Sequence, residues 1–343
     1  MHQHDASTEV LTQAIIRYAV DRVRMEPPLD GPRSRADLQA MVGETINERG
    51  IGGLEALRVF SDVLAPACIS VDHPRFLSFV PAAPTEASVL FDLVVGASSI
   101  YGGSWLEGAG AVFAENQALR YIADLAGMPA EAGGVFVSGG TAGNLSALIA
   151  ARHRWRTRAG GRLDRTRGLI ISSKGAHSSI AQACRAMDTD EVSVTADDEG
   201  RLHVENLREA IAALSAEDRE RVFAIVATSG TTNAGVIDDL TAAADVADEL
   251  GVWFHVDGAY GGAGLAAPSV RARYDGIERA DSFIVDPHKW LFAPFDCCAL
   301  LYRDPALAKA AHTQHAGYLD VLHGDDDEWN PSDFAHHLSR RGG

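Results

Sequence analysis

The sequence lacks the features of membrane and secreted proteins. No run of apolar residues approaches the length that spans a bilayer. The first residues, Met1-His2-Gln3-His4-Asp5, contain no basic segment followed by an apolar one, so no secretory signal is predicted. These absences predict a cytoplasmic protein with no membrane partner.

Paired cysteines are also absent. The four cysteines are Cys68, Cys184, Cys297 and Cys298, and none belongs to a Cys-x-x-Cys pair. Disulfide frameworks and zinc sites depend on such spacings. We therefore expect reduced, mostly buried thiols and no metal site.

Positive charge is in short supply. The chain has 30 Lys and Arg against 47 Asp and Glu, a formal net charge of −17. An acidic surface repels nucleic-acid phosphates and anionic lipid, so no nucleic-acid partner is predicted. A small anionic cofactor stays possible, because a single pocket can be positive on an acidic protein.

The N-terminal part of the chain has a helical pattern. Apolar residues at helical spacing predict a helix over residues 7–23, which Pro27 and Pro28 end. Two further helices are expected before the pattern changes. We therefore predict an N-terminal helical arm over residues 1–84, packed either on a partner subunit or on its own chain.

From about residue 135, short apolar runs alternate with helical segments. Strands are expected over 135–137, 169–171, 192–194, 222–227, 252–256, 283–285 and 299–302, with helices between them that include 141–158, 204–214 and 240–250. This alternation predicts an α/β fold with a mainly parallel sheet and helices on both faces. Its domain is expected to cover residues 85–343. Ligands bind such sheets beyond the carboxyl ends of the strands.

Small and polar residues follow three of these strands. Ser138-Gly139-Gly140-Thr141 opens a helix, and glycine turns at helix N-termini can bind phosphate through backbone N–H groups. His177 and Thr232 lie in similar turns after the next strands. Each turn alone has an ordinary structural explanation. Together they suggest a site for an anionic ligand that carries a flat ring.

Two more strands end in charged residues. Asp257 closes an apolar strand in His255-Val256-Asp257-Gly258-Ala259, and a poorly solvated carboxylate needs a cationic or hydrogen-bonding partner. A pyridinium nitrogen is such a partner, and Ala259 leaves room for a ring. Lys289 follows the next strand in Asp286-Pro287-His288-Lys289-Trp290. A lone lysine is more often a surface charge, but in this company Lys289 is a candidate nucleophile.

With these motifs the chain resembles the pyridoxal 5′-phosphate (PLP)-dependent group II amino acid decarboxylases, which include aromatic L-amino acid, glutamate and diaminobutyrate decarboxylases. The similarity extends from His73 to Tyr318 and is most specific in Asp-Pro-His-Lys-Trp and His-Val-Asp-Gly-Ala-Tyr. It implies the fold-type I architecture of aspartate aminotransferase. It also implies a homodimer with the site at the subunit boundary.

The resemblance assigns a role to each motif residue. Lys289 would hold PLP as a Schiff base, Asp257 would pair with the pyridine nitrogen, and His177 and Ala259 would lie on opposite ring faces. Gly140, Thr141 and either Asp286 or His288 would surround the phosphate, and Thr232 would lie near the ring substituents. Tyr318, placed by its spacing from Lys289, would protonate the carbanion. Some relatives carry Asn at the position of Asp286, where a carboxylate beside a phosphate is costly.

The resemblance implies release of carbon dioxide and an amine from an L-amino acid. An aldehyde synthase, an aminotransferase, a carbon–carbon lyase or a truncated inactive form are alternatives, the last because family members continue into a C-terminal small domain. An aromatic substrate is favoured by Phe79 and Trp105, which lie with Val80 and Pro81 where relatives line the substrate pocket. Both aromatic residues have an equally good explanation as core residues. Arg75 would instead suit an acidic substrate.

Overall fold

The computed structural model describes residues 5–314, 329–337 and 339–340. Its contacts divide the chain into two units, residues 1–78 and residues 79–343. Each unit is described by itself. Among the described residues, no helix combines the length and the apolar character needed to cross a membrane.

The first unit is helical, as the sequence predicts. It contains α1 (Ala6–Arg24), α2 (Arg35–Val42) and α3 (Gly53–Val59), followed by a π-helical turn (Phe60–Leu64) and a 3-10 turn (Ala65–Ala67). Asp5 caps α1, because its carboxylate accepts from the backbone N–H groups of Ser7 and Thr8. Neither α1 nor α2 contains a fully buried residue, although some side chains of α1 are partly covered, such as Tyr18, whose ring meets Phe60.

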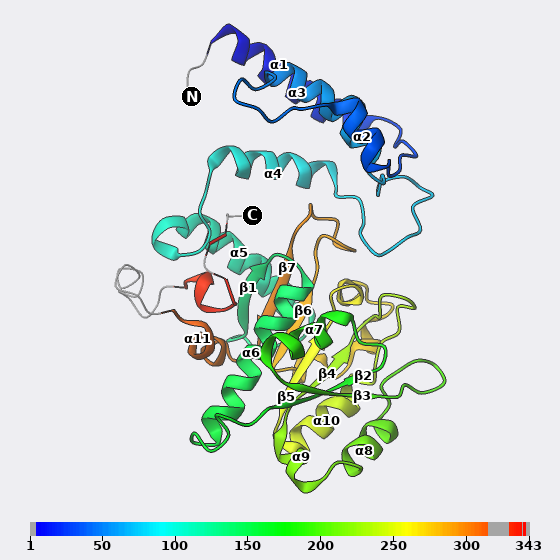
Figure 1. The fold of residues 1–343 in the computed structure, drawn as a ribbon. Helices are drawn as coiled ribbons and strands as arrows, with labels where there is room; N and C mark the ends of the chain where they lie inside the picture. Colours follow the sequence, from blue (N-terminus) through cyan, green and yellow to red (C-terminus); the bar gives the residue numbers. More distant parts are fainter. Residues whose placement is uncertain (1–4, 315–328, 338, 341–343) are drawn as a thin grey trace. The chain divides into compact units, whose positions relative to one another are not determined.

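The second unit is built on a seven-stranded sheet with helices around it (Figure 1). The strands are β1 (Gly133–Val137), β2 (Leu169–Ser173), β3 (Asp190–Val194), β4 (Val222–Thr228), β5 (Trp253–Asp257), β6 (Ser282–Val285) and β7 (Cys298–Tyr302). The helices are α4 (Glu86–Ser98), α5 (Trp105–Leu125), α6 (Gly140–Arg158), α7 (Ser178–Met187), α8 (Val204–Ala212), α9 (Ala216–Arg221), α10 (Leu240–Leu250) and α11 (Pro305–His312). Short 3-10 turns occupy Gly261–Ala266, Arg271–Tyr274, Ile277–Arg279 and Pro331–Asp333.

The strand order is β1-β7-β6-β5-β4-β2-β3. Strand β7 is antiparallel to both of its neighbours, and the other pairs are parallel. The other six strands therefore run in one direction. This architecture confirms the predicted mainly parallel sheet and brings the loops after β1, β2, β4, β5 and β6 to one edge.

Both faces of the sheet are buried. Side chains alternate between two cores: Ile225, Ala227 and Val256 pack on one face, and Ala224, Val226 and Ile284 pack on the other. Helices α5, α8 and α10 contribute to the first core, and α6, α7 and α11 to the second. This double burial explains why the strands are continuous apolar runs in the sequence.

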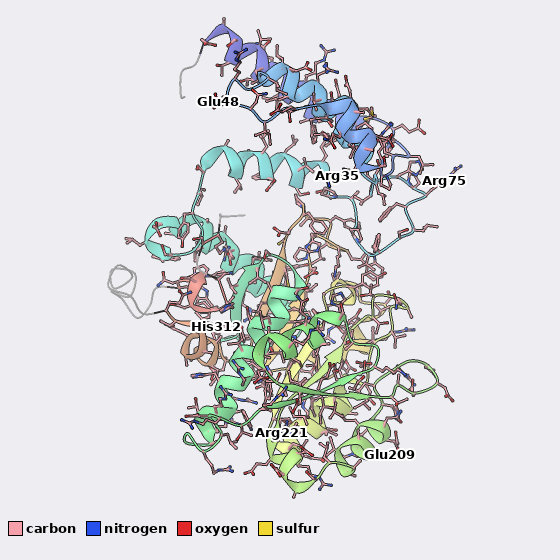
Figure 2. The ribbon with its side chains drawn as sticks, in the orientation of Figure 1. Arg35, Glu48, Arg75, Glu209, Arg221 and His312 are labelled. Atoms are coloured by element: carbon pink, nitrogen blue, oxygen red, sulfur yellow. The ribbon has the colours of Figure 1, made fainter. Side chains whose placement is uncertain are left out.

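The last described helix, α11, is anchored on α6 by a histidine. His312 is buried, and its Nε2 donates to the carbonyl oxygen of Ser146 at 3.0 Å (its position is labelled in Figure 2). A carbonyl oxygen only accepts, so Nε2 carries a proton and the neutral ring satisfies the contact. Burial lowers the pKa of His312 from 6.5 to about 4.

This lowered pKa predicts a pH-dependent stability. Between pH 6.5 and about 4 the unfolded chain takes up a proton at His312 that the folded chain does not, so the free energy of unfolding falls as the pH falls. His312→Gln keeps an N–H donor without a titrating ring and should lose about 3 kcal/mol less over that interval. Urea denaturation at a series of pH values measures the difference.

His153→Gln is the matched control, because His153 is exposed on α6 and its charge is only a minor cause of the lowered pKa of His312, after burial. The other buried histidines are present in the unaltered chain and in both variants, so their contributions to the pH dependence of the free energy of unfolding cancel. If His312→Gln and His153→Gln gave the same pH dependence as the unaltered chain, His312 would not be the titrating group.

Candidate active site

The loops at the carboxyl edge of the sheet enclose a pocket. Residues from the turns after β1, β2, β4, β5 and β6 line it: Gly140, Thr141, Asn144, His177, Thr228, Gly230, Thr231, Thr232, Asp257, Ala259, Tyr260, Asp286 and Lys289. Of the predicted site residues, the pocket brings together Lys289, Asp257, His177, Gly140, Thr141, Thr232 and Ala259. The parallel strand direction causes this convergence.

One end of the pocket is formed by the start of α6. Gly139 has a φ of +116°, a left-handed conformation that favours glycine, and no side chain caps the helix. The first N–H groups of α6 are therefore left for a ligand. A Cβ on Gly140 would lie 3.1 Å from the Cβ of Ala259, so glycine permits the close approach here. This geometry suits an anion.

Asp257 provides a buried carboxylate at the end of β5. It is 3% exposed, and its oxygens accept from Asn144 Nδ2 at 2.8 Å and from the backbone N–H of Ala259 at 3.0 Å. No cationic side chain of the described chain forms an ion pair with it. A buried carboxylate that faces a pocket and has no cationic partner is suited to bind a positively charged ligand atom.

Lys289 provides an amine on the same pocket. Its Nζ lies 2.9 Å from Asp286 Oδ2, and both residues come from the turn after β6. Asp286 is buried, and its other oxygen, Oδ1, has no hydrogen-bond partner in the described chain. Asp286 also lies beside the turn at Gly140, where its charge opposes an incoming anion unless Lys289 offsets it.

His177 is the N-cap residue of α7. Its Nδ1 accepts from the backbone N–H of Ser179 at 3.2 Å and lies 2.9 Å from Ser179 Oγ. Since a backbone N–H only donates, the neutral ring carries its proton on Nε2. His177 therefore lines the pocket as a ring with one N–H donor.

Hydroxyl groups line the pocket near the end of β4. Thr231 and Thr232 belong to this wall, and the buried hydroxyl of Thr228 has no hydrogen-bond partner in the part of the chain that the structure describes. The neighbouring Ser229 hydroxyl is in the same state. Unpaired buried hydroxyls beside a pocket are donors that a bound ligand can use.

Two predicted site residues are not among the pocket's lining residues. His288 is buried: its ring packs against Phe295 with 4.1 Å between centroids, and its Nδ1 lies against the backbone of Cys297. Its Nε2 lies 3.6 Å from Oδ2 of the lining residue Asp286. Tyr318 lies outside the described residues. Phe79, Val80, Pro81, Trp105 and Arg75, the predicted substrate-binding residues, are likewise not among the described residues that line this pocket.

Thr228, Gly230, Thr231 and Tyr260 line the pocket without having been predicted as site residues, and so does Asn144. It lies one helical turn after Gly140 on α6, so it shares the face that meets the pocket. That spacing was the available signal, since the asparagine closes the Gly-rich motif. Asn144 is buried and donates to Asp257.

These features fit PLP. The uncapped start of α6 suits its phosphate, Asp257 suits its ring nitrogen, and the Lys289 amine can bond to its aldehyde. The unpaired hydroxyl of Thr228 adds a polar wall. The described residues contain no cluster of His, Cys, Asp and Glu that could hold a metal ion, and the four cysteines are free.

Comparison with known proteins gives a consistent result. The family model for the pyridoxal-dependent decarboxylase conserved domain matches residues 53–342. The chain is 32% identical to an aromatic-L-amino-acid decarboxylase of Bacillus atrophaeus over 89% of its length. It is 33% identical to an L-2,4-diaminobutyrate decarboxylase of Rhizobium meliloti over 91% of its length.

Solved structures agree on the fold. A structure of Oryza sativa TDC with PLP and tryptamine matches 100% of this chain and 73% of that one, with a TM-score of 0.91 and 24% identity. A structure of mouse CSAD matches 99% of this chain and 72% of that one, with a TM-score of 0.88 and 27% identity. These matches confirm the predicted fold-type I architecture.

The chain spans less than two thirds of the curated relatives. The matched regions cover 63% of the Bacillus atrophaeus protein and 62% of the Rhizobium meliloti protein. The matches therefore show the family of this chain, and they do not show that it carries out the activity of the whole relatives.

The position of Asp286 leads to a prediction. Asp286→Asn removes a negative charge beside the anion site and beside the Lys289 amine. PLP should bind up to about tenfold more tightly, which corresponds to about 1 kcal/mol. The melting temperature should stay unchanged or rise, because an incompletely paired buried charge is lost. Fluorescence titration and thermal unfolding measure the two effects.

Asp275→Asn serves as the control, since Asp275 is exposed and its carboxylate forms an ion pair with the nearby Arg271, away from the pocket residues. It should change neither quantity. Weaker PLP binding by Asp286→Asn would show instead that the carboxylate contributes to cofactor binding.

Proposed function

This chain belongs to the pyridoxal-dependent decarboxylase family, and from that membership we propose that it binds PLP through Lys289 and removes the carboxyl group of an L-amino acid. The observation that carries the proposal is the convergence of Lys289, Asp257 and His177 with the start of α6 in one pocket. An amine, a buried carboxylate, an imidazole and an anion site are the groups that PLP chemistry requires.

The bound cofactor would supply an electron-poor ring that accepts the electron pair left when the carboxylate departs. Asp257 would keep that ring electron-poor by holding a proton on the pyridine nitrogen. Its carboxylate suits this role because it is buried and already oriented by Asn144 and the backbone of Ala259. The α6 N-terminus would hold the phosphate.

Lys289 would bond to the cofactor, and His177 would orient the cofactor ring and the substrate. Asp286 holds the Lys289 amine over the pocket, and the amine is the group that bonds to the cofactor aldehyde. His177 would stack on one face of the ring and offer its Nε2–H to the substrate carboxylate, while Ala259 would pack on the opposite face. Tyr318 is proposed, on the resemblance alone, to supply the proton that takes the place of the lost carboxylate.

An aromatic L-amino acid is the proposed substrate. The relative from Bacillus atrophaeus supports this choice. Tyr260 lines the pocket, and its ring centroid lies 4.6 Å from that of Trp290, so an aromatic surface borders the site. L-2,4-Diaminobutyrate is the second candidate, favoured by the relative from Rhizobium meliloti at 33% identity.

We also propose a cytoplasmic homodimer with the domain boundary after residue 84. Four free cysteines are consistent with a reducing compartment. Val10, Ile15 and Ile16 on α1 and Phe91 on α4 are exposed apolar side chains that a second subunit would cover.

Lys289 can be tested directly, because the chain has three lysines, Lys174, Lys289 and Lys309. Borohydride reduction of the PLP-loaded protein should leave the pyridoxyl group on Lys289, and peptide mass spectrometry identifies the modified residue. Lys289→Ala should lose both the trapped group and the visible absorbance of the bound cofactor. Lys309→Ala is the matched control and should keep both. Equal labelling of all three lysines would contradict the assignment.

The reaction can be tested with a substrate panel. The PLP-loaded chain should release carbon dioxide and the amine in equal amounts from an L-amino acid. Its kcat/KM should be at least about tenfold higher for tryptophan, tyrosine or phenylalanine than for 2,4-diaminobutyrate or glutamate, a difference of about 1.4 kcal/mol. Keto acid without carbon dioxide would identify an aminotransferase and overturn the proposal. No product from a chain that binds PLP would identify an inactive form.

A further inference from the structure

One asparagine connects the two ring-binding residues of the pocket. The Nδ2 group of Asn144 lies 2.8 Å from Asp257 Oδ2 and 2.9 Å from Ser179 Oγ. Ser179 in turn contacts His177 Nδ1 through its hydroxyl at 2.9 Å and its backbone N–H at 3.2 Å. Asn144 therefore touches Asp257 directly and reaches His177 through a single serine.

The orientation of the Asn144 amide follows from its neighbours. An ionised carboxylate only accepts, so the Nδ2 group, with its two hydrogens, must face Asp257 and Ser179. The amide oxygen is then left to face His255 Nε2, 2.8 Å away. An oxygen that accepts requires a donor, and His255 therefore carries its proton on Nε2.

Behind Asn144, the same logic continues into the core. His255 Nδ1 lacks a proton and accepts from the Ser282 hydroxyl at 2.7 Å. Ser282 Oγ accepts from Trp253 Nε1 at 2.8 Å. His255, Ser282 and Trp253 are fully buried, and burial lowers the pKa of His255, which keeps the ring neutral.

All the donors in this chain of hydrogen bonds point toward the pocket. The direction runs from Trp253 through Ser282 and His255 to Asn144, and there it divides toward Asp257 and toward Ser179. We propose that Asn144, held by His255, is the positioning residue that orients the Asp257 carboxylate and the His177 ring together. This inference rests on the proposed PLP function. The directions of the hydrogen bonds do not depend on that function.

The arrangement has a chemical reason. A buried carboxylate beside a pocket would lower its energy by turning toward another donor, and that change would weaken its hold on a ring nitrogen. The Asn144 donor holds the Asp257 carboxylate in one orientation. Because the same amide group also donates to Ser179 Oγ, it leaves the hydroxyl hydrogen of Ser179 to point toward His177 Nδ1.

The protonated nitrogen of His255 can be measured in the unaltered chain. Long-range proton–nitrogen NMR on protein with 15N-labelled histidine distinguishes the two neutral ring forms, and His255→Gln identifies the signal. We expect the Nε2–H form both without and with PLP. A neutral Nδ1–H form would overturn the inference, because Nε2 would then accept from Asn144 and the amide oxygen would have to face Asp257.

Two substitutions separate the roles of Asn144. Asn144→Ala removes donor and acceptor, so His255 should change to the Nδ1–H form with Ser282 as acceptor. Asn144→Asp keeps an acceptor for His255 but replaces the donor by a charge beside Asp257, so the proton should stay on Nε2. Both variants should bind PLP about tenfold to a hundredfold more weakly.

Asn206 supplies matched controls, since its Nδ2 donates to the Thr195 carbonyl at 2.7 Å on the surface. Asn206→Ala and Asn206→Asp should leave the PLP affinity and the His255 signal unchanged. Unaltered PLP affinity in Asn144→Ala would overturn the positioning role. Failure of the unaltered chain to bind PLP would instead refute the proposed function, while the NMR measurement on the unloaded protein would still test the network.

Discussion

The structure of the site depends on keeping one carboxylate charged in a dry environment. Asp257 ends a strand whose residues are all buried, so water cannot compensate its charge. Its compensation comes from Asn144 and from the backbone of Ala259. Asn144 can reach it only because α6 crosses the sheet directly after the glycine turn. The helix that presents its N-terminus to an anion therefore also supplies the donor for the carboxylate.

Trp253, Ser282 and His255 form a row of buried polar residues behind Asn144. Buried polar groups are costly unless each is paired, and here each member from Trp253 to Asn144 has a partner. Such a network tolerates little rearrangement, because a change of one proton position forces the others to change. Rigidity of this kind would suit the proposed binding of a flat ring between His177 and Ala259.

The local charge of the pocket contrasts with that of the whole chain. The protein carries a formal charge of −17, yet the anion site is built from a helix N-terminus and Lys289 rather than from a cluster of basic side chains. Backbone dipoles and one amine act at short range, so the acidic surface does not prevent their use. Asp286 is the exception, and its contact with Lys289 offsets part of its negative charge at the pocket.

The sequence by itself determined the strands, the parallel α/β class and seven pocket residues, because double burial makes each strand an apolar run and each motif follows directly on a strand. It also predicted the helices α1, α2 and α3. Only the tertiary structure decided that His288 packs against Phe295 and does not line the pocket, that Asp286 pairs with Lys289, and that Asn144 joins Asp257 to Ser179. Side-chain direction and hydrogen-bond partners depend on residues far apart in the chain, such as Asn144 and His255, and no local pattern specifies which of them meet.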